Sequence, residues 1–149
     1  MPSNVTAKIK WVRKRPVLYI ATALTIFVAL ITIHTLPTLW LSRASYTLEI
    51  VSTPESQKQG LSGRAHLARN KGMLFAYSTQ TERCFWMKDM QFPIDIIWAD
   101  QNKKVTHIET AVSPKSYPKT FCALGQYVFE LNAHEADRNN LKEGQTLTF

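Results

Sequence analysis

An uncharged apolar run near the N-terminus constrains this chain more than any other feature. From Pro16 to Ser42 there is no Asp, Glu, Lys or Arg, and residues 17–36 include 15 apolar residues out of 20. A helix rises about 1.5 Å per residue, so twenty residues reach about 30 Å, the thickness of the hydrocarbon core of a bilayer. The run is apolar all round rather than along one stripe, which argues against a core helix of a soluble domain. We therefore predict one transmembrane helix at residues 17–36.

The charges beside this run predict its orientation. Five Lys or Arg residues lie within residues 8–15, whereas only Arg43 follows the run closely. The positive-inside rule then places the N-terminus in the cytoplasm and the C-terminal part outside, as in a single-pass protein of the cell membrane. The expected organisation is a basic cytoplasmic tail, a membrane anchor, a linker and an extracytoplasmic domain, at residues 1–16, 17–36, 37–45 and 46–149.

A cleaved secretory signal is the alternative interpretation of the same segment. Ser42-Arg43-Ala44 resembles the small-x-small pattern before a cleavage site. The apolar region of a signal usually runs only 7–15 residues, so an uncleaved anchor is favoured. Either interpretation exports the C-terminal domain.

The distribution of charge argues against a nucleic-acid partner. The formal net charge is +7, but residues 1–44 hold six Lys or Arg and no acid, and residues 45–149 hold 12 Lys or Arg against 11 Asp or Glu. The basic character therefore belongs to the tail, and the exported domain has no electrostatic reason to bind nucleic acid. The expected partners are the membrane and an unidentified envelope ligand or protein.

The exported region has the patterns of a mainly β domain. Tyr46 to Val51 alternate with period two, which predicts a strand. Segments rich in β-branched and aromatic residues predict further strands at residues 73–77, 84–88, 94–99, 104–109, 126–131 and 145–149. Asp and Asn within residues 100–103 suit a tight turn and predict a hairpin there. Strands at this spacing predict a compact antiparallel barrel or sandwich.

Two short helices are expected between these strands. Thr53 followed by proline, with Gly60 beyond the last turn, has the start and stop signals of a helix. Asn132 with Glu135 three residues later resembles a capping box and predicts a second helix that runs to residue 139.

The two cysteines are natural disulfide partners. Cys84 lies in a predicted strand and Cys122 in a long irregular segment, residues 111–125. Extracytoplasmic compartments let disulfides persist, so we expect the bridge to tie this segment down; two buried free thiols are the alternative. The cysteines do not form a Cys-x-x-Cys motif, and we expect no metal and no cofactor.

A series of short motifs occurs in a characteristic order. They are Gly60-Leu61, Arg64, Gly72-Met73-Leu74-Phe75, Phe85-Trp86-Met87-Lys88-Asp89, Pro93-Ile94-Asp95-Ile96-Ile97, His107-Ile108-Glu109 and Tyr127-Val128-Phe129-Glu130-Leu131-Asn132-Ala133. Over roughly residues 46–149 the chain closely resembles the domain of unknown function family 192. The resemblance implies a small β-rich domain, often behind a signal or anchor, with no assigned activity and no catalytic residues. The chain has Ser62-Gly63 where members tend to have a methionine.

Two acids occupy strands that otherwise look buried. In residues 94–99, Asp95 shares a face with Ile97, opposite Ile94, Ile96 and Trp98; Glu130 lies opposite the face of Tyr127, Phe129 and Leu131. Buried acids need partners, and Lys88 or Arg64 could neutralise Asp95. Hydrogen bonds to turns and neighbouring backbone are the favoured interpretation. Asp95, Glu109 and Glu130 could alternatively supply an acid/base pair for glycoside chemistry, which needs carboxyl groups about 5–9 Å apart.

The segment from Cys84 to Asp89 is the candidate ligand-contacting strand. Trp86 and Met87 point to opposite faces of the predicted strand, and in most small β domains such residues are core, so both are expected in the core; an aromatic platform that contacts a ligand is the alternative. The candidate ligand-binding residues are Trp86, Lys88, Asp89, Asp95, Glu130 and Asn132. The widely separated histidines are expected to be structural or surface residues: His66, His107 and His134.

These observations favour binding over catalysis. No nucleophile motif, metal box or phosphate loop accompanies the acids. We therefore expect a membrane-anchored extracytoplasmic binding or accessory module of the cell envelope, with an unknown ligand. The alternatives are an envelope hydrolase that uses paired carboxylates and a structural protein-interaction domain.

Overall fold

The computed structural model describes residues 38–41 and 44–149. The expected tail and membrane span, and most of the possible cleavage site, lie outside these residues. No helix in the described part of the chain is long and apolar enough to cross a membrane. Strand β2 (Ala44–Val51) contains the strand predicted from Tyr46 to Val51. Strand β1 (Thr38–Leu41), which pairs with it in antiparallel fashion, lies where the sequence predicts a linker.

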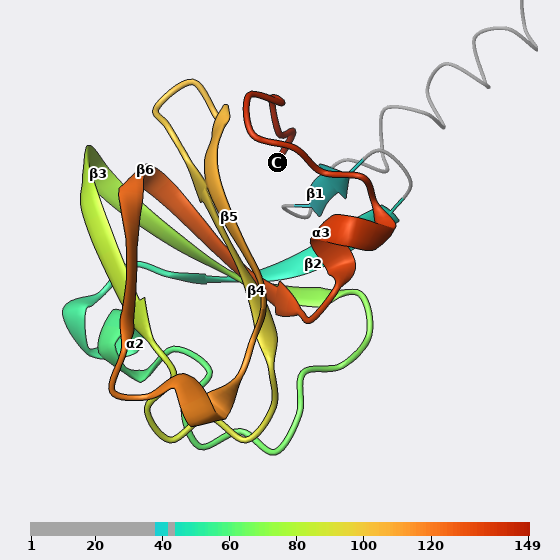
Figure 1. The fold of residues 1–149 in the computed structure, drawn as a ribbon. Coiled ribbons are helices and arrows are strands. Elements are labelled where there is room, and N and C mark those ends of the chain that lie inside the picture. The colour runs from blue at the N-terminus through green and yellow to red at the C-terminus, as the bar shows by residue number, and fades with distance from the viewer. Residues whose placement is uncertain (1–37, 42–43) are drawn as a thin grey trace, which may run out of the picture. The chain divides into compact units, whose positions relative to one another are not determined.

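One six-stranded sheet forms the domain (Figure 1). Its order is β1-β2-β3-β6-β4-β5, and the remaining strands are β3 (Lys71–Trp86), β4 (Ile94–Ala99), β5 (Val105–Val112) and β6 (Thr120–Asn132). The mainly β class is confirmed. The antiparallel barrel or sandwich is corrected in two respects: the sheet is not closed, and β2 pairs with β3 in parallel.

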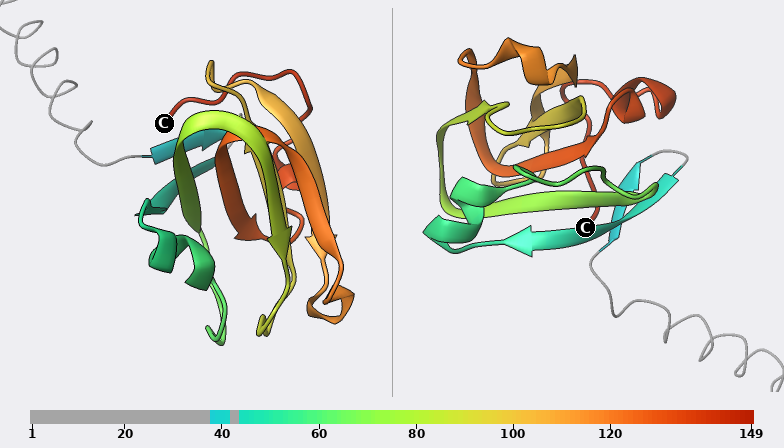
Figure 2. Two further views of the ribbon diagram at one scale, coloured as in Figure 1. Left: turned by 90° about the vertical axis from the view of Figure 1, so that its left-hand side faces the viewer. Right: turned by 90° about the horizontal axis from the view of Figure 1, so that it is seen from below.

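The sheet curls because its two longest strands arch together (Figure 2). The register of β3 against β6 shifts between Ala76 and Thr81, so the far halves of both strands turn over the sheet. There the indole N–H of Trp98 in β4 donates to the Arg83 carbonyl at 2.9 Å. Gly125 allows this close approach, since a Cβ at this position would lie 3.2 Å from Trp98 Cδ1.

Curling produces two hydrophobic cores, one on each face of the sheet. The inner core contains Val51, Leu61, Met73, Phe75, Phe85, Met87, Ile94, Ile96, Trp98, Val112, Phe121 and Val128. The outer core contains Tyr46, Leu48, Leu74, Ile97, Ala99, Val105, Phe129, Leu131, Ala136 and Leu147. Strand β4 contributes alternately to both cores, which confirms the predicted facing of its residues and explains its continuous apolar sequence.

Helix α2 (Pro54–Gln59) forms as predicted. Thr53 is its N-cap and exchanges reciprocal hydrogen bonds with Ser56 in a capping box. Gly60 ends the helix with φ +50°, a backbone conformation that glycine adopts without the penalty paid by other residues. The first helix is therefore specified by local sequence.

Helix α3 (Glu135–Arg138) forms, but the predicted capping box of Asn132 is wrong. The N-cap is His134, at φ +68°, and its side chain makes no capping bond in the described structure. Asn132 is instead the last residue of β6 and donates its side-chain amide to the carbonyls of Leu67 and Ala68. Pairing of β6 extends to residue 132 because β4 supplies the hydrogen-bonding partner.

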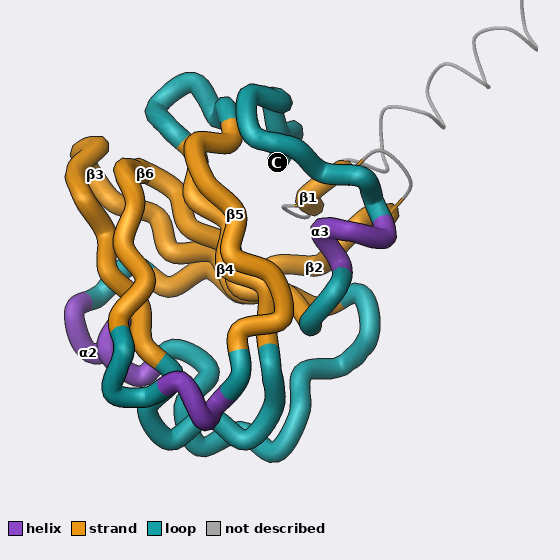
Figure 3. Tube along the Cα trace, viewed as in Figure 1, coloured by secondary structure: helices purple, strands orange, loops and turns teal. Residues whose placement is uncertain are grey.

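Three further element predictions differ from the structure, and tertiary pairing is the common reason. Residues 73–77 and 84–86 belong to the single strand β3, because β6 pairs with both halves of it; Met87 and Lys88, predicted in the second strand, follow its end. The predicted irregular segment contains a 3-10 turn, Pro114–Ser116, and then the start of β6. Residues 145–149 form no strand but only isolated bridge residues, of which Thr146 pairs with Lys104, although Leu147 is buried. Figure 3 shows the loops gathered at the ends of the strands.

Candidate functional site

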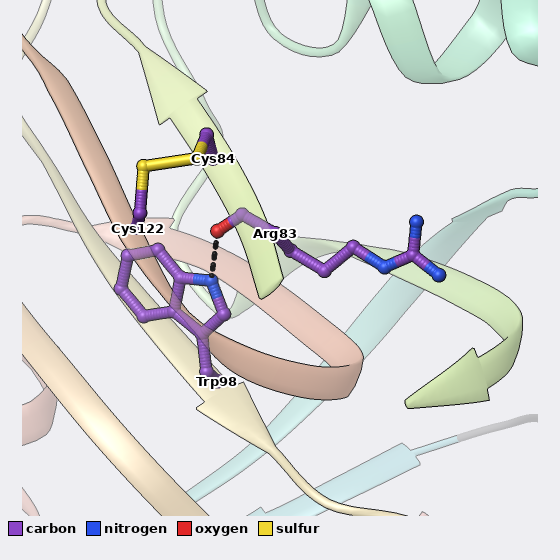
Figure 4. Close-up of a disulfide and its surroundings, with 4 residues drawn as sticks. All are labelled: Arg83, Cys84, Trp98 and Cys122. Atoms are coloured by element: carbon purple, nitrogen blue, oxygen red, sulfur yellow. Dashed lines mark hydrogen bonds between the residues drawn. A yellow bond between two sulfur atoms is a disulfide. The ribbon is translucent and has the colours of Figure 1, made fainter. Parts of the chain in front are cut away.

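A cross-strand disulfide marks the region of the candidate site (Figure 4). Cys84 of β3 and Cys122 of β6 lie directly opposite in register, with a Cα–Cα distance of 4.1 Å. The predicted pairing is confirmed. The bridge joins two paired strands rather than tying down a loop, because Cys122 lies within β6. The Trp98 bond to Arg83 attaches β4 beside it, so three strands are linked here.

A pocket of about 210 Å³, which we call the Glu130 pocket, lies next to this disulfide. Its lining includes Gly60 and Leu61 after α2, Phe75, Tyr77, Cys84, Phe85 and Trp86 of β3, and Glu130 of β6. Four of these side chains are aromatic and several belong to the inner core, and the lining is completed by Gln57, Lys58, Gln59, Ser62 and Met90. The pocket is therefore a small indentation into the core with one acid in its wall.

Glu130 is buried there without a compensating charge. The residue is 5% exposed, and its Oε2 atom has no hydrogen-bond partner among the described residues. Burial raises the pKa of this carboxyl to about 8, and the distant charge of Arg64 lowers it only in part. Arg64 itself pairs with Glu49, its two nitrogens lying 2.8 and 2.9 Å from the carboxylate oxygens. Glu130 is thus mostly protonated at neutral pH.

A wider pocket of about 700 Å³, the outer pocket, adjoins the first. The two share four lining residues: Lys58, Gln59, Ser62 and Trp86. The outer pocket adds Glu55, Gly63, Lys88, Asp89 and Tyr117. Its two aromatic residues, Trp86 and Tyr117, are 46% and 48% exposed. The expectation of a core position is wrong for Trp86, which is a surface residue that lines both pockets, and is confirmed for Met87, which is 1% exposed.

Backbone contacts hold the walls of the outer pocket together. The N–H of Gly63 donates to the Asp89 carbonyl at 2.9 Å. The Ser62 hydroxyl donates to the Lys88 carbonyl, also at 2.9 Å. The loop after β3 is thus attached to the turn after α2, and Lys88 and Asp89 have a defined position beside Trp86.

The structure brings only part of the predicted site together. Trp86, Lys88 and Asp89 line the outer pocket, and Glu130 lines the pocket beside it. Asn132 lines a separate, shallow pocket near α3. Asp95 lines none of these three pockets.

Asp95 has a structural role, because its carboxyl group bonds to the backbone of the domain. It is fully buried and accepts backbone N–H bonds from Ala111, His134 and Ala136 at 2.8, 3.0 and 2.8 Å. The expectation that Lys88 or Arg64 neutralises it is wrong, and the favoured interpretation, that it bonds to backbone, is confirmed. Three N–H donors satisfy a buried carboxylate without a cation.

The three acids considered for hydrolysis do not share a pocket. Glu109 lies 3.2 Å from His107 Nε2 and Asp95 is bonded to backbone. Neither of them lines the Glu130 pocket. Residues 44–149 also contain no group of three or more His, Cys, Asp or Glu side chains placed to hold a metal ion.

Sequence reasoning missed several pocket residues. Glu55, Lys58, Ser62 and Tyr117 all line the outer pocket. They come from α2, the turn after it and the loop before β6, which meet at the end of β3 only in the folded domain, so no local pattern predicts them. The best local signal is Tyr117 itself, an aromatic residue in a proline-containing loop.

Comparison with known proteins adds a family and two related structures. Residues 39–149 match the DUF192 family, described as "Uncharacterized ACR". A proposed transcription regulator from Sinorhizobium meliloti 1021 is 26% identical, with a TM-score of 0.69 over 74% of this chain and 89% of that one. A protein of unknown function from Novosphingobium aromaticivorans DSM 12444 is also 26% identical, with a TM-score of 0.69 over 75% of this chain and 82% of that one. No significant match to a curated protein was found.

Proposed function

Because the chain belongs to the uncharacterised DUF192 family, we propose its function from the site itself. It is a membrane-anchored, extracytoplasmic binding module of the cell envelope. Its ligand occupies the outer pocket and extends past Trp86 into the Glu130 pocket. The apolar run at residues 17–36 supports the anchor, and the charges before it support the orientation.

The position of Trp86 carries this proposal. A half-exposed indole lies where two pockets meet, with Lys88 and Asp89 on the wider side. Ligand sites commonly combine aromatic walls with a few placed polar groups. The disulfide at Cys84, two residues earlier, stiffens the strand that holds the indole. A rigid wall reduces the conformational entropy lost on binding.

Binding is better supported than either catalysis or nucleic-acid recognition. The Glu130 pocket contains one acid, whereas glycoside hydrolysis uses two facing carboxyl groups. The Sinorhizobium relative is named as a proposed transcription regulator. Residues 45–149 of this chain are close to neutral in charge, which does not favour a DNA surface.

Fluorine NMR on the full-length protein in dodecyl maltoside tests the proposal. The chain has four tryptophans, and 5-fluorotryptophan labelling gives each one a resonance that Trp86→Phe and Trp98→Phe assign. The probes are phenol, N-acetylglucosamine, acetate and ethanolamine. We expect at least one to shift the Trp86 resonance saturably while that of the fully buried Trp98 stays in place.

Two variants and a negative outcome complete this test. Lys88→Ala and Tyr117→Ala remove outer-pocket side chains, so each should weaken the saturable shift. Lys142→Ala, at an exposed residue outside the three described pockets, is the control and should leave it unchanged. If no probe shifts Trp86, or if Trp86 and Trp98 shift together, the proposed site is wrong.

A further inference from the structure

The buried carboxyl group of Glu130 has neither an ion-pair partner nor a hydrogen-bond partner within the described domain. Within residues 45–149, no ion pair includes Glu130, and its Oε2 atom has no hydrogen bond. This oxygen faces Gly60, since a Cβ at that glycine would lie 3.8 Å from it, and Gly60 lines the same pocket. An unpartnered buried polar atom beside a cavity indicates a partner that arrives from outside.

The walls around this oxygen have the chemistry that attracts cations. Tyr77, Phe85 and Trp86 line the pocket, and the face of an aromatic ring carries partial negative charge. The ring of Tyr77 already holds one cation, because the Arg83 guanidinium lies 3.7 Å from its centroid. Aromatic walls with one acid form the kind of environment that binds organic ammonium groups.

We propose that the Glu130 pocket binds an organic ammonium ion, with the Glu130 carboxylate as its counter-ion and the rings of Tyr77 and Trp86 against its carbon atoms. This inference rests on the proposed binding function and names the chemistry of the ligand. A volume of about 210 Å³ corresponds to roughly seven water molecules at about 30 Å³ each, which is enough for a small ammonium group. The ion can be a free amine or the head of a larger ligand that continues into the outer pocket.

Binding must be coupled to loss of a proton. The protonated carboxyl of Glu130 releases one proton to solvent, and the resulting carboxylate pairs with the ammonium group; no other bond forms or breaks. Burial raises the pKa of Glu130 to about 8, so most molecules carry this proton at pH 7. Affinity for the cation should therefore rise by about tenfold between pH 7 and pH 9, as the carboxylate fraction rises.

Among the charged and titratable groups around Glu130, we expect Glu130 itself to release the proton when the cation binds. Arg64 is engaged by Glu49. Tyr77 stays neutral, because burial raises its pKa above the ordinary value. The other neighbours are Lys58, which lines both pockets, Arg83 over the Tyr77 ring and, beyond Ile96 and Trp98 of β4, Glu109 and His107 of β5.

Choline and its neutral isostere test the inference directly. Full-length protein in dodecyl maltoside, a detergent without an ammonium group, is titrated with choline, ethanolamine and 3,3-dimethylbutan-1-ol. Affinity is read from the Trp86 fluorine resonance. At pH 9 we expect at least one of the two ammonium ions to bind tenfold or more tightly than the alcohol. Choline and ethanolamine together distinguish a methylated from a primary ammonium preference, and binding of either supports the inference.

Glu130→Gln and Glu109→Gln form a matched pair of variants. Glu130→Gln should reduce ammonium affinity at least tenfold and leave the alcohol unaffected. Glu109→Gln makes the same change at an acid outside the pocket and should leave both affinities unchanged. Calorimetry on the wild type in two buffers of different ionisation enthalpy should find about 0.9 proton released per choline or ethanolamine bound at pH 7.

Three results would overturn the inference: equal affinity for the alcohol and the ammonium ions, unchanged ammonium binding by Glu130→Gln, or no proton release at pH 7. If Glu130→Gln fails to fold, as judged from the Trp98 resonance, the wild-type calorimetry decides. A neutral probe that shifts Trp86 while neither ammonium ion binds would leave the binding module standing and remove the ammonium ligand. Failure of every probe would remove both.

Discussion

The carboxylate of Asp95 accepts the backbone N–H of Ala136 at 2.8 Å, so a residue of β4 caps the first turn of α3, 41 positions later in the chain. The same carboxylate accepts from Ala111 and His134. Helix α3 thus receives from the sheet the cap that its own N-cap side chain does not provide. An acid that looks like a ligand-binding residue in the sequence is part of the fold.

Replacing Asp95 should therefore destabilise the domain without altering the binding site directly. Asp95→Ala leaves three backbone N–H groups without their acceptor, two of them at a partly buried helix start, which should cost on the order of 3–5 kcal/mol. Urea unfolding followed by the Trp98 resonance measures the loss. Asp137→Ala, at an exposed residue of the same helix, is the control. Equal midpoints for the two variants would contradict the structural role of Asp95.

The disulfide should contribute much of the domain's stability. Cys84 and Cys122 are separated by 38 residues, and closing a loop of this length corresponds to about 4 kcal/mol in the chain-entropy model. The double variant Cys84→Ser, Cys122→Ser should unfold at a correspondingly lower urea concentration. Thiol labelling of the denatured, unreduced wild type should find neither cysteine free, and full labelling of both would contradict the bridge.

Glu130 should make the empty protein less stable as pH rises. Its pKa is 4.5 in the unfolded chain and about 8 in the folded domain, so between these values the folded state holds more protons than the unfolded state. Stability should fall with rising pH across this window, by on the order of 5 kcal/mol in total. Glu130→Gln should remove this dependence and be more stable than the wild type at pH 9. A wild-type curve that does not fall relative to the variant would contradict the burial of an uncompensated acid.

His107 should titrate above its ordinary pKa of 6.5. Partial burial lowers the pKa, but hydrogen bonds to Glu109 and Glu143 together raise it further than burial lowers it. The stabilisation from the charged ring is fully present below pH 6.5 and is lost as the pH rises through the folded-state pKa. NMR titration of the His107 ring should show the upward shift in the wild type. The shift should be smaller in Glu143→Gln, and an unchanged value there would exclude this contact in solution.

The topology prediction can be tested in cells. A reporter that is active only outside the cytoplasm, fused after Phe149, should give signal, because residues 8–15 retain the N-terminus inside. Immunoblotting of the same fusion should show the uncleaved length. A stable but silent fusion would contradict export of the domain, and a shortened product would favour the cleaved signal.

Local sequence rules predicted the elements whose partners lie close along the chain. The β4–β5 hairpin forms around a turn in which the Asp100 carboxylate accepts the N–H groups of Asn102 and Lys104. Helix α2 begins and ends where Thr53 and Gly60 predict. In each case the stabilising contact is within a few residues, so the sequence pattern contains it.

The candidate site was predicted only in part for the opposite reason. Trp86, Lys88 and Asp89 lie within four residues, at the end of β3 and in the loop after it, so their common location follows from their closeness in the sequence. Glu130 joins them only because β6 pairs with β3. Asp95 and Asn132 were assigned to the site because they are polar residues in apolar strands, a pattern that does not distinguish a ligand contact from a backbone acceptor or donor.

The amino-acid sequence by itself determined the mainly β class, the family, the two faces of β4 and the pairing of its two cysteines, because composition, periodicity and local turn chemistry encode them. Tertiary structure alone decided that the sheet curls without closing, that Asp95 caps α3 and that Glu130 lies unpartnered beside Trp86. Burial and the identity of a hydrogen-bond partner depend on segments that are distant in the chain and meet only in the folded domain.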